Sequence, residues 1–140
     1  MQILVVGCGR IGTYLVEELL AKGHQVAVVE KDPSRCEQLA SENRSDALRI
    51  VHGDGNDPIV LREAGARDAD ALAAATGEDE DNLVIGLLGK REFGIRRVIG
   101  RVNNPRNAWL YSAAFGFDAA VRPAETIVSL IEEQIESPTP

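Results

Sequence analysis

One short stretch decides the fold: Gly7-Cys8-Gly9-Arg10-Ile11-Gly12, which places the pattern G-x-G-x-x-G near the start of a 140-residue chain. The pattern alone is weak evidence because glycine is common, but its surroundings are specific. Residues 3–6 are apolar and mostly β-branched, as expected for a strand buried on both faces. From Ile11 onward, apolar residues recur at helical spacing until Gly23 interrupts them. The sequence therefore predicts a strand, a glycine turn and a helix.

Each glycine of the turn has a physical role in a dinucleotide-binding fold. Gly7 permits the tight turn, Gly9 lets a pyrophosphate approach the backbone, and Gly12 lets the helix pack closely on the strand. Unpaired N–H groups and a partial positive charge at the helix N-terminus then favour the phosphates, and Arg10 is a candidate for a further contact. The whole turn, with Cys8 and Ile11, is therefore a candidate cofactor-binding segment.

Glu30 ends the next expected strand, about 20 residues after the turn, where such folds carry the carboxylate that binds the ribose. It would accept hydrogen bonds from the adenosine ribose, and its charge would repel the extra phosphate of NADP. The neighbouring Lys31 weakens that repulsion slightly. NAD(H) is therefore the expected cofactor, with ADP, ATP or AMP as alternatives.

Strands and helices alternate along the whole chain. The expected strands cover residues 3–6, 25–30, 48–52, 71–75, 97–102 and 119–121. The expected helices begin at residues 11 and 33 and then cover 58–64, 79–93, 105–115 and 124–135. Strict alternation with short connections predicts a doubly wound α/β Rossmann fold, with a six-stranded parallel sheet and helices on both faces. We expect a single domain over residues 1–136, followed by a frayed tail at 137–140.

Composition narrows the classes of partner. The formal net charge is −7, which disfavours binding to nucleic acid or to anionic lipid. Apolar runs are far shorter than the roughly 20 residues of a membrane span, and Met1 leads into a strand without a signal-peptide pattern. The 2 cysteines, Cys8 and Cys36, lack the spacing of a zinc site or redox motif. We expect a cytoplasmic protein without direct membrane insertion, nucleic-acid partner or metal.

Other polar residues follow the expected strands. Asp54, after the third strand, either meets the adenine amino group or stabilises a turn. Thr76 and Gly77 end the fourth strand beside the expected switch point, where the second ribose would lie. The acidic run 78–81 suggests helix capping rather than a cation site. Cys8, at a helix N-terminus, either has a lowered pKa and reacts or merely fills space, and the second is favoured.

Several stretches along the chain follow the pattern of one family. They are the glycine turn, Glu30-Lys31-Asp32-Pro33, His52-Gly53-Asp54-Gly55, Ala69-Asp70-Ala71, Glu80-Asp81-Asn82-Leu83 and Arg101-Val102-Asn103-Asn104-Pro105. Together they resemble the N-terminal nucleotide-binding domain of regulators of potassium conductance, the TrkA N-terminal or RCK domain, from Met1 to about Glu136. The resemblance implies a cytoplasmic regulatory domain, a homodimer or larger ring, and a potassium channel or transporter partner that holds it at the inner face of the membrane.

The resemblance also implies roles for individual residues. It places pyrophosphate on Gly7, Gly9 and Gly12, ribose on Glu30 and adenine near Asp54. It places Arg101, at the end of the fifth strand, in the ligand cleft or at a subunit contact. The chain departs from the family where Gly55-Asn56 replaces the usual alanine and threonine.

The main rival function is an NAD-dependent oxidoreductase. Such an enzyme needs a proton donor and a substrate pocket, and neither Tyr14 nor Tyr111 has the lysine four residues later that short-chain reductases use. A purely structural adaptor, the third alternative, would bind no nucleotide. The sequence therefore favours nucleotide sensing without catalysis.

The last expected helix has an apolar face opposite glutamates. The apolar residues are Ile127, Val128, Leu130, Ile131 and Ile135, and the glutamates are Glu132, Glu133 and Glu136. This face either packs on the chain's own sheet, as most amphipathic helices do, or crosses to a partner subunit. The family resemblance favours the second arrangement, which would give an isologous dimer.

Overall fold

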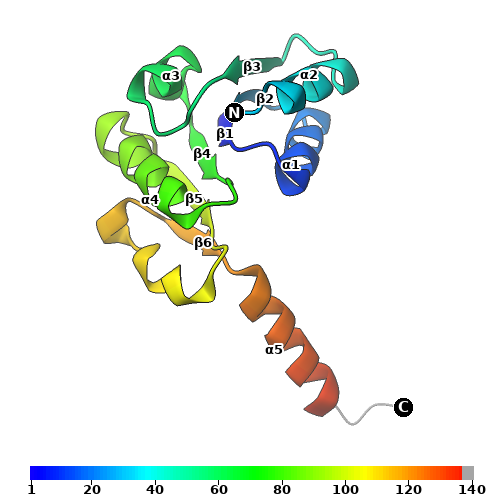
Figure 1. The fold of residues 1–140 in the computed structure, drawn as a ribbon, viewed down its shortest axis with the longest axis vertical. Helices are drawn as coiled ribbons and strands as arrows, with labels where there is room; N and C mark the ends of the chain where they lie inside the picture. Colours follow the sequence, from blue (N-terminus) through cyan, green and yellow to red (C-terminus); the bar gives the residue numbers. More distant parts are fainter. Residues whose placement is uncertain (137–140) are drawn as a thin grey trace.

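The computed structural model describes residues 1–136, apart from the side chain of Ile11. A 6-stranded parallel sheet forms its centre, in the order β3-β2-β1-β4-β5-β6 (Figure 1). The strands are β1 (Gln2–Val6), β2 (Gln25–Glu30), β3 (Leu48–His52), β4 (Ala71–Ala74), β5 (Arg97–Arg101) and β6 (Ala119–Val121). The strand order reverses between β1 and β4, which is the switch point of a Rossmann fold. The predicted fold class is therefore confirmed.

Of the five α-helices that the structure describes, four cover the two faces of the sheet and the last extends away from it. The five are α1 (Arg10–Ala21), α2 (Pro33–Glu42), α3 (Pro58–Glu63), α4 (Asp79–Leu87) and α5 (Pro123–Glu136). Val16 of α1 and Leu39 of α2 share one core cluster with Val5 of β1. Leu61 of α3 and Ile85 of α4 share the other cluster, on the opposite face. None of the described helices is long and apolar enough to cross a membrane.

Local sequence explains where α2 and α3 begin. The Asp32 carboxylate accepts a hydrogen bond from the Ser34 backbone N–H at 2.9 Å, and Asp57 caps α3 in the same way. A proline follows each cap at the first helical position, where its missing N–H costs nothing. These two caps fix the loops after β2 and β3, which border the site.

The predicted helix over 105–115 was wrong. This segment forms two short 3₁₀-helices, Pro105–Leu110 and Ala113–Phe115. Tyr111 leaves helical geometry between them, with φ −80° and ψ 69°, because its buried ring packs on Phe117, 4.9 Å away between centroids. The predicted helix over 79–93 is α-helical only to Leu87 and continues as a π-helix over Leu88–Glu92.

Within residues 1–136, one face of β5 and β6 lacks a covering helix. Register pairs Val5 with Ala73, Ala73 with Ile99 and Ile99 with Ala119, and paired residues share a face of the sheet. Val5 belongs to the core under α1 and α2, so Ile99 lies on that face too. Ile99 is nevertheless 39% exposed, and Val121, two residues after Ala119, is 53% exposed. An apolar strip is left open to solvent.

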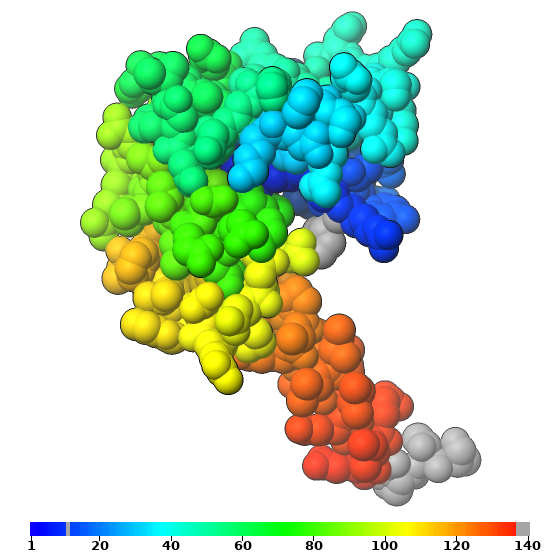
Figure 2. All heavy atoms as spheres, viewed as in Figure 1, coloured from blue at the N-terminus to red at the C-terminus, as the bar shows by residue number. Residues whose placement is uncertain are grey.

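Helix α5 extends away from the sheet instead of packing on it (Figures 1 and 2). None of its residues is buried. Leu130 and Ile131 are 52% and 53% exposed, and Ile135 is 77% exposed. The alternative in which this helix packs on its own sheet is therefore wrong. The expected tail at 137–140 lies outside the described residues.

Candidate functional site

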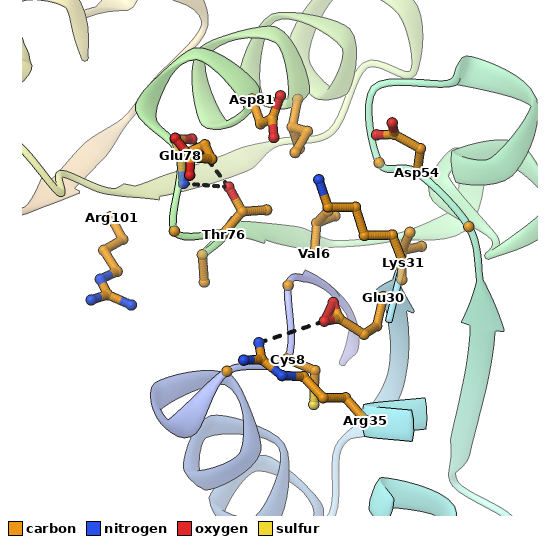
Figure 3. Close-up of a pocket in the computed structure, with 18 residues that line it drawn as sticks. Val6, Cys8, Glu30, Lys31, Arg35, Asp54, Thr76, Glu78, Asp81 and Arg101 are labelled. Carbon is orange, nitrogen blue, oxygen red and sulfur yellow. Dashed lines mark hydrogen bonds and ion pairs between the residues drawn. The ribbon is translucent and has the colours of Figure 1, made fainter. Parts of the chain in front are cut away.

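A cavity of about 350 Å³ lies at the carboxyl ends of the central strands (Figure 3). The predicted site residues that line it are Gly7, Cys8, Gly9, Glu30, Lys31, Asp54, Thr76, Gly77 and Arg101. Carboxyl strand ends at a switch point are where ligands bind in open α/β sheets. The structure thus brings together residues that are far apart in sequence, at the position expected for a nucleotide.

Three residues of the glycine motif do not line this cavity. Arg10 is exposed and borders a separate hollow between α1 and α2, together with Tyr14. Gly12 is buried beneath the turn, and the Ile11 side chain is not described. Arg10 therefore lies beside the cavity rather than within it.

Gly7 and Gly12 are required by the protein's own packing. Gly7 has φ +102°, and a Cβ there would lie 2.8 Å from the backbone nitrogen of Thr76. A Cβ on Gly12 would lie 2.5 Å from the carbonyl oxygen of Gly7, closer than real Cβ contacts allow. Helix α1 thus approaches the end of β1 closely, as the sequence predicted.

At Gly9, by contrast, the protein's own packing does not require a glycine. Its φ of −77° suits any residue, and among the described parts of the chain beyond its neighbours the one atom within 4 Å of an added Cβ is Arg35 Nη1, at 3.6 Å. Gly9 is the N-cap of α1, and no side chain caps this helix. The first-turn N–H groups therefore have no partner within the helix and can receive an anion. The bare backbone at Gly9 fits a ligand that approaches closely.

Glu30, at the end of β2, and Asp54, after β3, line the same side of the cavity. Glu30 is buried, with 7% exposure, and its Oε1 lies 3.8 Å from Arg35 Nη1. Asp54 is exposed, and its Oδ1 accepts a hydrogen bond from the Asn56 backbone N–H at 2.9 Å. Asp54 therefore stabilises the turn after β3 while also lining the cavity.

The departure from the family pattern at Gly55 has a packing explanation. Gly55 is buried, and a Cβ there would lie 2.4 Å from Val6 Cγ1 and 3.2 Å from Ile85 Cδ1. Val6 and Ile85 fill the space that the usual alanine would take. Position 55 therefore shapes the floor of the cavity without offering a polar group.

Asn82 clamps the ends of β4 and β5 at the switch point. Its Oδ1 accepts hydrogen bonds from Thr76 N at 3.0 Å and Thr76 Oγ1 at 2.7 Å. Its Nδ2 donates to the carbonyl oxygens of Thr76, at 3.1 Å, and Arg101, at 3.0 Å. Asn82 is fully buried, and its side-chain oxygen and nitrogen are both hydrogen-bonded, as buried polar groups usually are. It positions two predicted site residues.

Asp79 ties the start of α4 to the segment after β5. Its Oδ1 accepts from the Asn103 N–H at 2.8 Å and from the Tyr111 hydroxyl at 2.7 Å. Its Oδ2 accepts from the Asn104 N–H at 2.8 Å and from Asn107 Nδ2 at 2.9 Å. Burial alone raises the pKa of Asp79, but these hydrogen bonds outweigh it and lower the pKa to about 2. Asp79 is therefore ionised at neutral pH.

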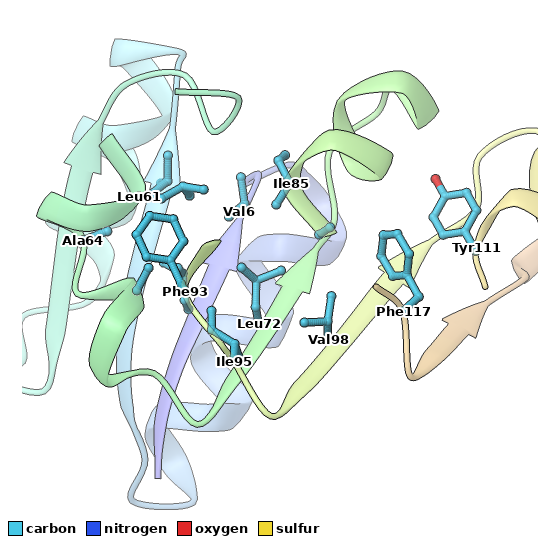
Figure 4. Packing of buried hydrophobic residues seen from close by; sticks show 14 of the residues in the cluster. Val6, Leu61, Ala64, Leu72, Ile85, Phe93, Ile95, Val98, Tyr111 and Phe117 are labelled. Carbon is cyan, nitrogen blue, oxygen red and sulfur yellow. The ribbon is translucent and has the colours of Figure 1, made fainter. Parts of the chain in front are cut away.

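The acidic run 78–81 opens α4 as predicted and places Asp79, Glu80 and Asp81 in its first turn, but Asp79 also reaches across to another segment. The N-cap of α4 is Glu78, whose side chain makes no capping bond. Tyr111, once weighed as an oxidoreductase tyrosine, packs on Phe117 (Figure 4) and donates to Asp79. Burial, and next the bond to Asp79, hold the pKa of Tyr111 well above its usual value. Tyr111 is a structural residue here.

Cys8 is a buried filler of the glycine turn. It is 3% exposed, and its Sγ lies 3.7 Å from Thr13 Oγ1. Burial raises the pKa of Cys8, so the alternative of a reactive thiol with a lowered pKa is wrong.

Comparison with known proteins gives this site a context. The family model described as the TrkA-N domain matches residues 3–123. The Trk system potassium uptake protein TrkA of Mycobacterium tuberculosis is 36% identical over 135 residues, which is 96% of this chain and 60% of that protein. The chain thus spans less than two thirds of the length of this relative.

Solved structures share the fold. The TrkA-N domain of the inner membrane protein ybaL from Escherichia coli superposes with a TM-score of 0.79 at 22% identity, over 96% of each chain. The GsuK channel bound to NAD matches with a TM-score of 0.73 at 22% identity, over 86% of this chain and 21% of that one. The Kef C-terminal domain of Shewanella denitrificans in its AMP-bound form matches with a TM-score of 0.74 at 20% identity, over 99% and 84%.

Proposed function

Because the chain belongs to the TrkA-N domain family, we propose that it is a nucleotide-sensing regulatory domain that binds NAD(H), or ADP, ATP or AMP, and controls a potassium channel or transporter. The observation that carries the proposal is the uncapped N-terminus of α1 at Gly9, which opens into the same cavity as the buried Glu30. A helix N-terminus receives phosphate, and a carboxylate at the end of β2 receives ribose. One neighbouring structure is described as bound to NAD and another to AMP.

We assign the ligand to the cavity residues in this way. The phosphates lie over the backbone of Gly7 and Gly9, and the adenosine ribose lies on Glu30. The adenine lies near Asp54, and Lys31 borders the ribose. A second ribose, where the ligand has one, lies by Thr76, Gly77 and Arg101.

Calorimetry with NAD, NADH, ADP and AMP tests this function. We expect saturable binding of at least one of them in the micromolar range, typical of a sensor (about −8 kcal/mol at 1 μM). A panel of carbonyl substrates with NADH should give no turnover. Turnover would favour the oxidoreductase, and no binding at all would favour the structural adaptor.

Glu30→Gln is expected to weaken NAD binding about 10- to 100-fold, because the ribose hydroxyls lose a charged acceptor (about 1–3 kcal/mol). The substitution should also narrow the preference for NAD over NADP, since the charge that repels the extra phosphate is gone. Calorimetry with both cofactors measures this. Glu63→Gln, an exposed carboxylate at the end of α3 and outside the cavity, is the matched control. Equal binding of NAD and NADP by the wild type would contradict the assignment of Glu30.

We also propose that two copies of the chain form an isologous homodimer through α5, and that such dimers assemble into larger rings. No described residue of the chain covers the exposed apolar face of α5 or the open strip at Ile99 and Val121. A second copy can supply cover for both at once, because each copy carries both surfaces. Nucleotide binding could then change the geometry of the dimer, provided that the ligand binds two geometries with different affinity.

The double substitution Leu130→Asp with Ile131→Asp is expected to convert a micromolar dimer to a monomer without unfolding it. Both side chains are half exposed in the isolated chain, so their replacement removes no core packing. Light scattering reads the mass, and circular dichroism confirms the fold. Glu132→Gln with Glu133→Gln, on the polar face of the same helix, should leave the dimer intact. A wild-type monomer at high concentration, with nucleotide still bound, would contradict this assembly.

The cellular setting follows from the same proposal. A domain of this kind lies in the cytoplasm, peripheral to the inner face of the membrane through its potassium channel or transporter. The curated relative is a component of a potassium uptake system, and the chain matches 60% of its length. The acidic charge of −7 gives no basis for nucleic acid as a partner.

A further inference from the structure

Arg35 is a charged residue of the cavity wall that no sequence pattern singled out. It belongs to the first turn of α2, which the Asp32 cap holds in place. Its Nη1 would lie 3.6 Å from a Cβ on Gly9, with no other atom of the described chain within 4 Å of that position. Figure 3 shows the side chain reaching from α2 toward the glycine turn. A full positive charge is therefore held beside the N-terminus of α1.

Two carboxylates orient the Arg35 guanidinium without forming hydrogen bonds to it. Nη1 lies 3.8 Å from Glu30 Oε1, and Nε lies 3.8 Å from Asp32 Oδ2. Both distances exceed the roughly 2.7–3.2 Å of an N–H···O hydrogen bond. The Arg35 side chain is also 53% exposed. Its donors thus remain available to a ligand in the cavity.

The cavity is lined by more carboxylates than cations, so an anionic ligand needs a cation close to its phosphates. The lining carboxylates are Glu30, Asp54, Glu78 and Asp81, and the lining cations are Lys31, Arg35 and Arg101. An anionic ligand would meet repulsion from the first group. The partial charge of a helix N-terminus offsets about half an elementary charge, which is less than a pyrophosphate carries. Of the three cations, Arg35 is the one within contact distance of the space above Gly9.

We propose that Arg35 is a phosphate-binding residue, whose guanidinium donates to a phosphate held over Gly9 while Glu30 binds the ribose. This proposal rests on the proposed nucleotide-binding function and assigns a side chain to the 5′-phosphate that NAD, ADP, ATP and AMP share. Glu30 and Arg35 then bind neighbouring parts of one ligand, the ribose and the phosphate. A guanidinium suits phosphate because its planar donors match two phosphate oxygens.

The test compares ADP, adenosine, NAD and NADP on the wild type and on Arg35→Gln, Arg35→Lys and Arg62→Gln. Arg62→Gln removes the same charge from α3, outside the cavity, and is the matched control. We expect Arg35→Gln to weaken ADP and NAD about 10- to 100-fold, as for loss of a charge-assisted hydrogen bond. Adenosine affinity should change less than about twofold, which is within the small effect of surface substitutions. Arg35→Lys should lose less than Arg35→Gln, because it keeps the charge without the planar donors.

Thermal unfolding confirms that each variant is folded before affinities are compared. Equal loss of ADP and adenosine binding would overturn the proposal, because Arg35 would then only position Glu30. A loss of affinity confined to NADP would also overturn the proposal, since the guanidinium would then bind the extra phosphate on the ribose of NADP and not the 5′-phosphate. A wild type that binds none of the phosphorylated ligands is a different failure, which removes the nucleotide-binding function itself.

Discussion

Gly12→Val is expected to weaken nucleotide binding about 100-fold and to lower the free energy of unfolding by about 3 kcal/mol, the upper part of the usual range for overpacking. A Cβ at this position already lies 2.5 Å from the carbonyl oxygen of Gly7, and that atom is backbone that cannot rotate away. Valine must therefore push α1 off the end of β1. The first-turn N–H groups then lose their alignment with the phosphates. Loss of two charge-assisted hydrogen bonds corresponds to about a 100-fold weaker affinity.

Gly9→Ala is the matched control, because it separates the fold from the ligand. Nothing in the described chain opposes a Cβ at Gly9 beyond the ordinary contact with Arg35, so the free energy of unfolding should hardly change. Affinity should still fall, since the methyl group would occupy the space where the phosphate approaches the backbone. Calorimetry and urea unfolding on both variants measure the two effects. Unchanged affinity in a folded Gly12→Val protein would show that the phosphates do not lie on this turn.

The parts of the fold that could be predicted from the sequence are those set by short-range patterns of apolar residues and glycines. The strand, turn and helix around Gly7 and Gly12 follow from side-chain period and from the steric demands of glycine. In the structure, the backbone of α1 at Gly12 lies so close to Gly7 that a side chain at Gly12 would not fit. Alternation then determines the parallel sheet, because each parallel crossover needs a covering helix.

The residues that the sequence did not reveal act across distant segments. Arg35 reaches Gly9 only because β1 and β2 are neighbours, so that the two helix starts meet at one sheet edge. In the acidic run 78–81, composition does not say which carboxylate points inward. A weaker signal was present, since Asp79 and Asn82 are three residues apart and share the buried face of α4 with Ile85. Polar residues at core positions of a helix are often fixed by hydrogen bonds.

Tertiary packing also explains the wrong helix over 105–115. The segment has helical composition, but Tyr111 is drawn out of helical geometry by Asp79 and Phe117. Gly100 makes room for both rings, since a Cβ there would lie 2.5 Å from Phe117 and 2.7 Å from Tyr111. Local propensity is a weak prior that such contacts override.

Asp79→Asn should lower the free energy of unfolding at pH 7 by about 3 kcal/mol, since two donors that faced a carboxylate oxygen would face an amide N–H instead. A melting temperature about 10 °C lower is expected for a domain of this size. Glu80→Gln, an exposed neighbour on the same helical turn, is the matched control and should stay within about 0.5 kcal/mol of the wild type. Tyr111→Phe removes one of the four hydrogen bonds that Asp79 accepts from Asn103, Asn104, Asn107 and Tyr111. It should lower the free energy of unfolding by about 1–2 kcal/mol.

The pH dependence of stability tests whether the charge of Asp79, and not only its hydrogen-bond geometry, stabilises the folded protein. The folded-state pKa is about 2, against 3.8 for the unfolded chain, so the folded state favours the ionised carboxylate. The stability that this difference supplies, about 2.5 kcal/mol, is fully present well above pH 3.8 and is lost as the pH falls through 2. The gap in unfolding free energy between wild type and Asp79→Asn should therefore be constant from pH 7 to pH 5 and should narrow below it. Urea unfolding at a series of pH values measures the gap. A gap that stays constant down to pH 3 would mean that the pKa of Asp79 is the same in the folded and the unfolded state, so that its bonds to Asn103, Asn104 and Tyr111 do not favour the ionised carboxylate.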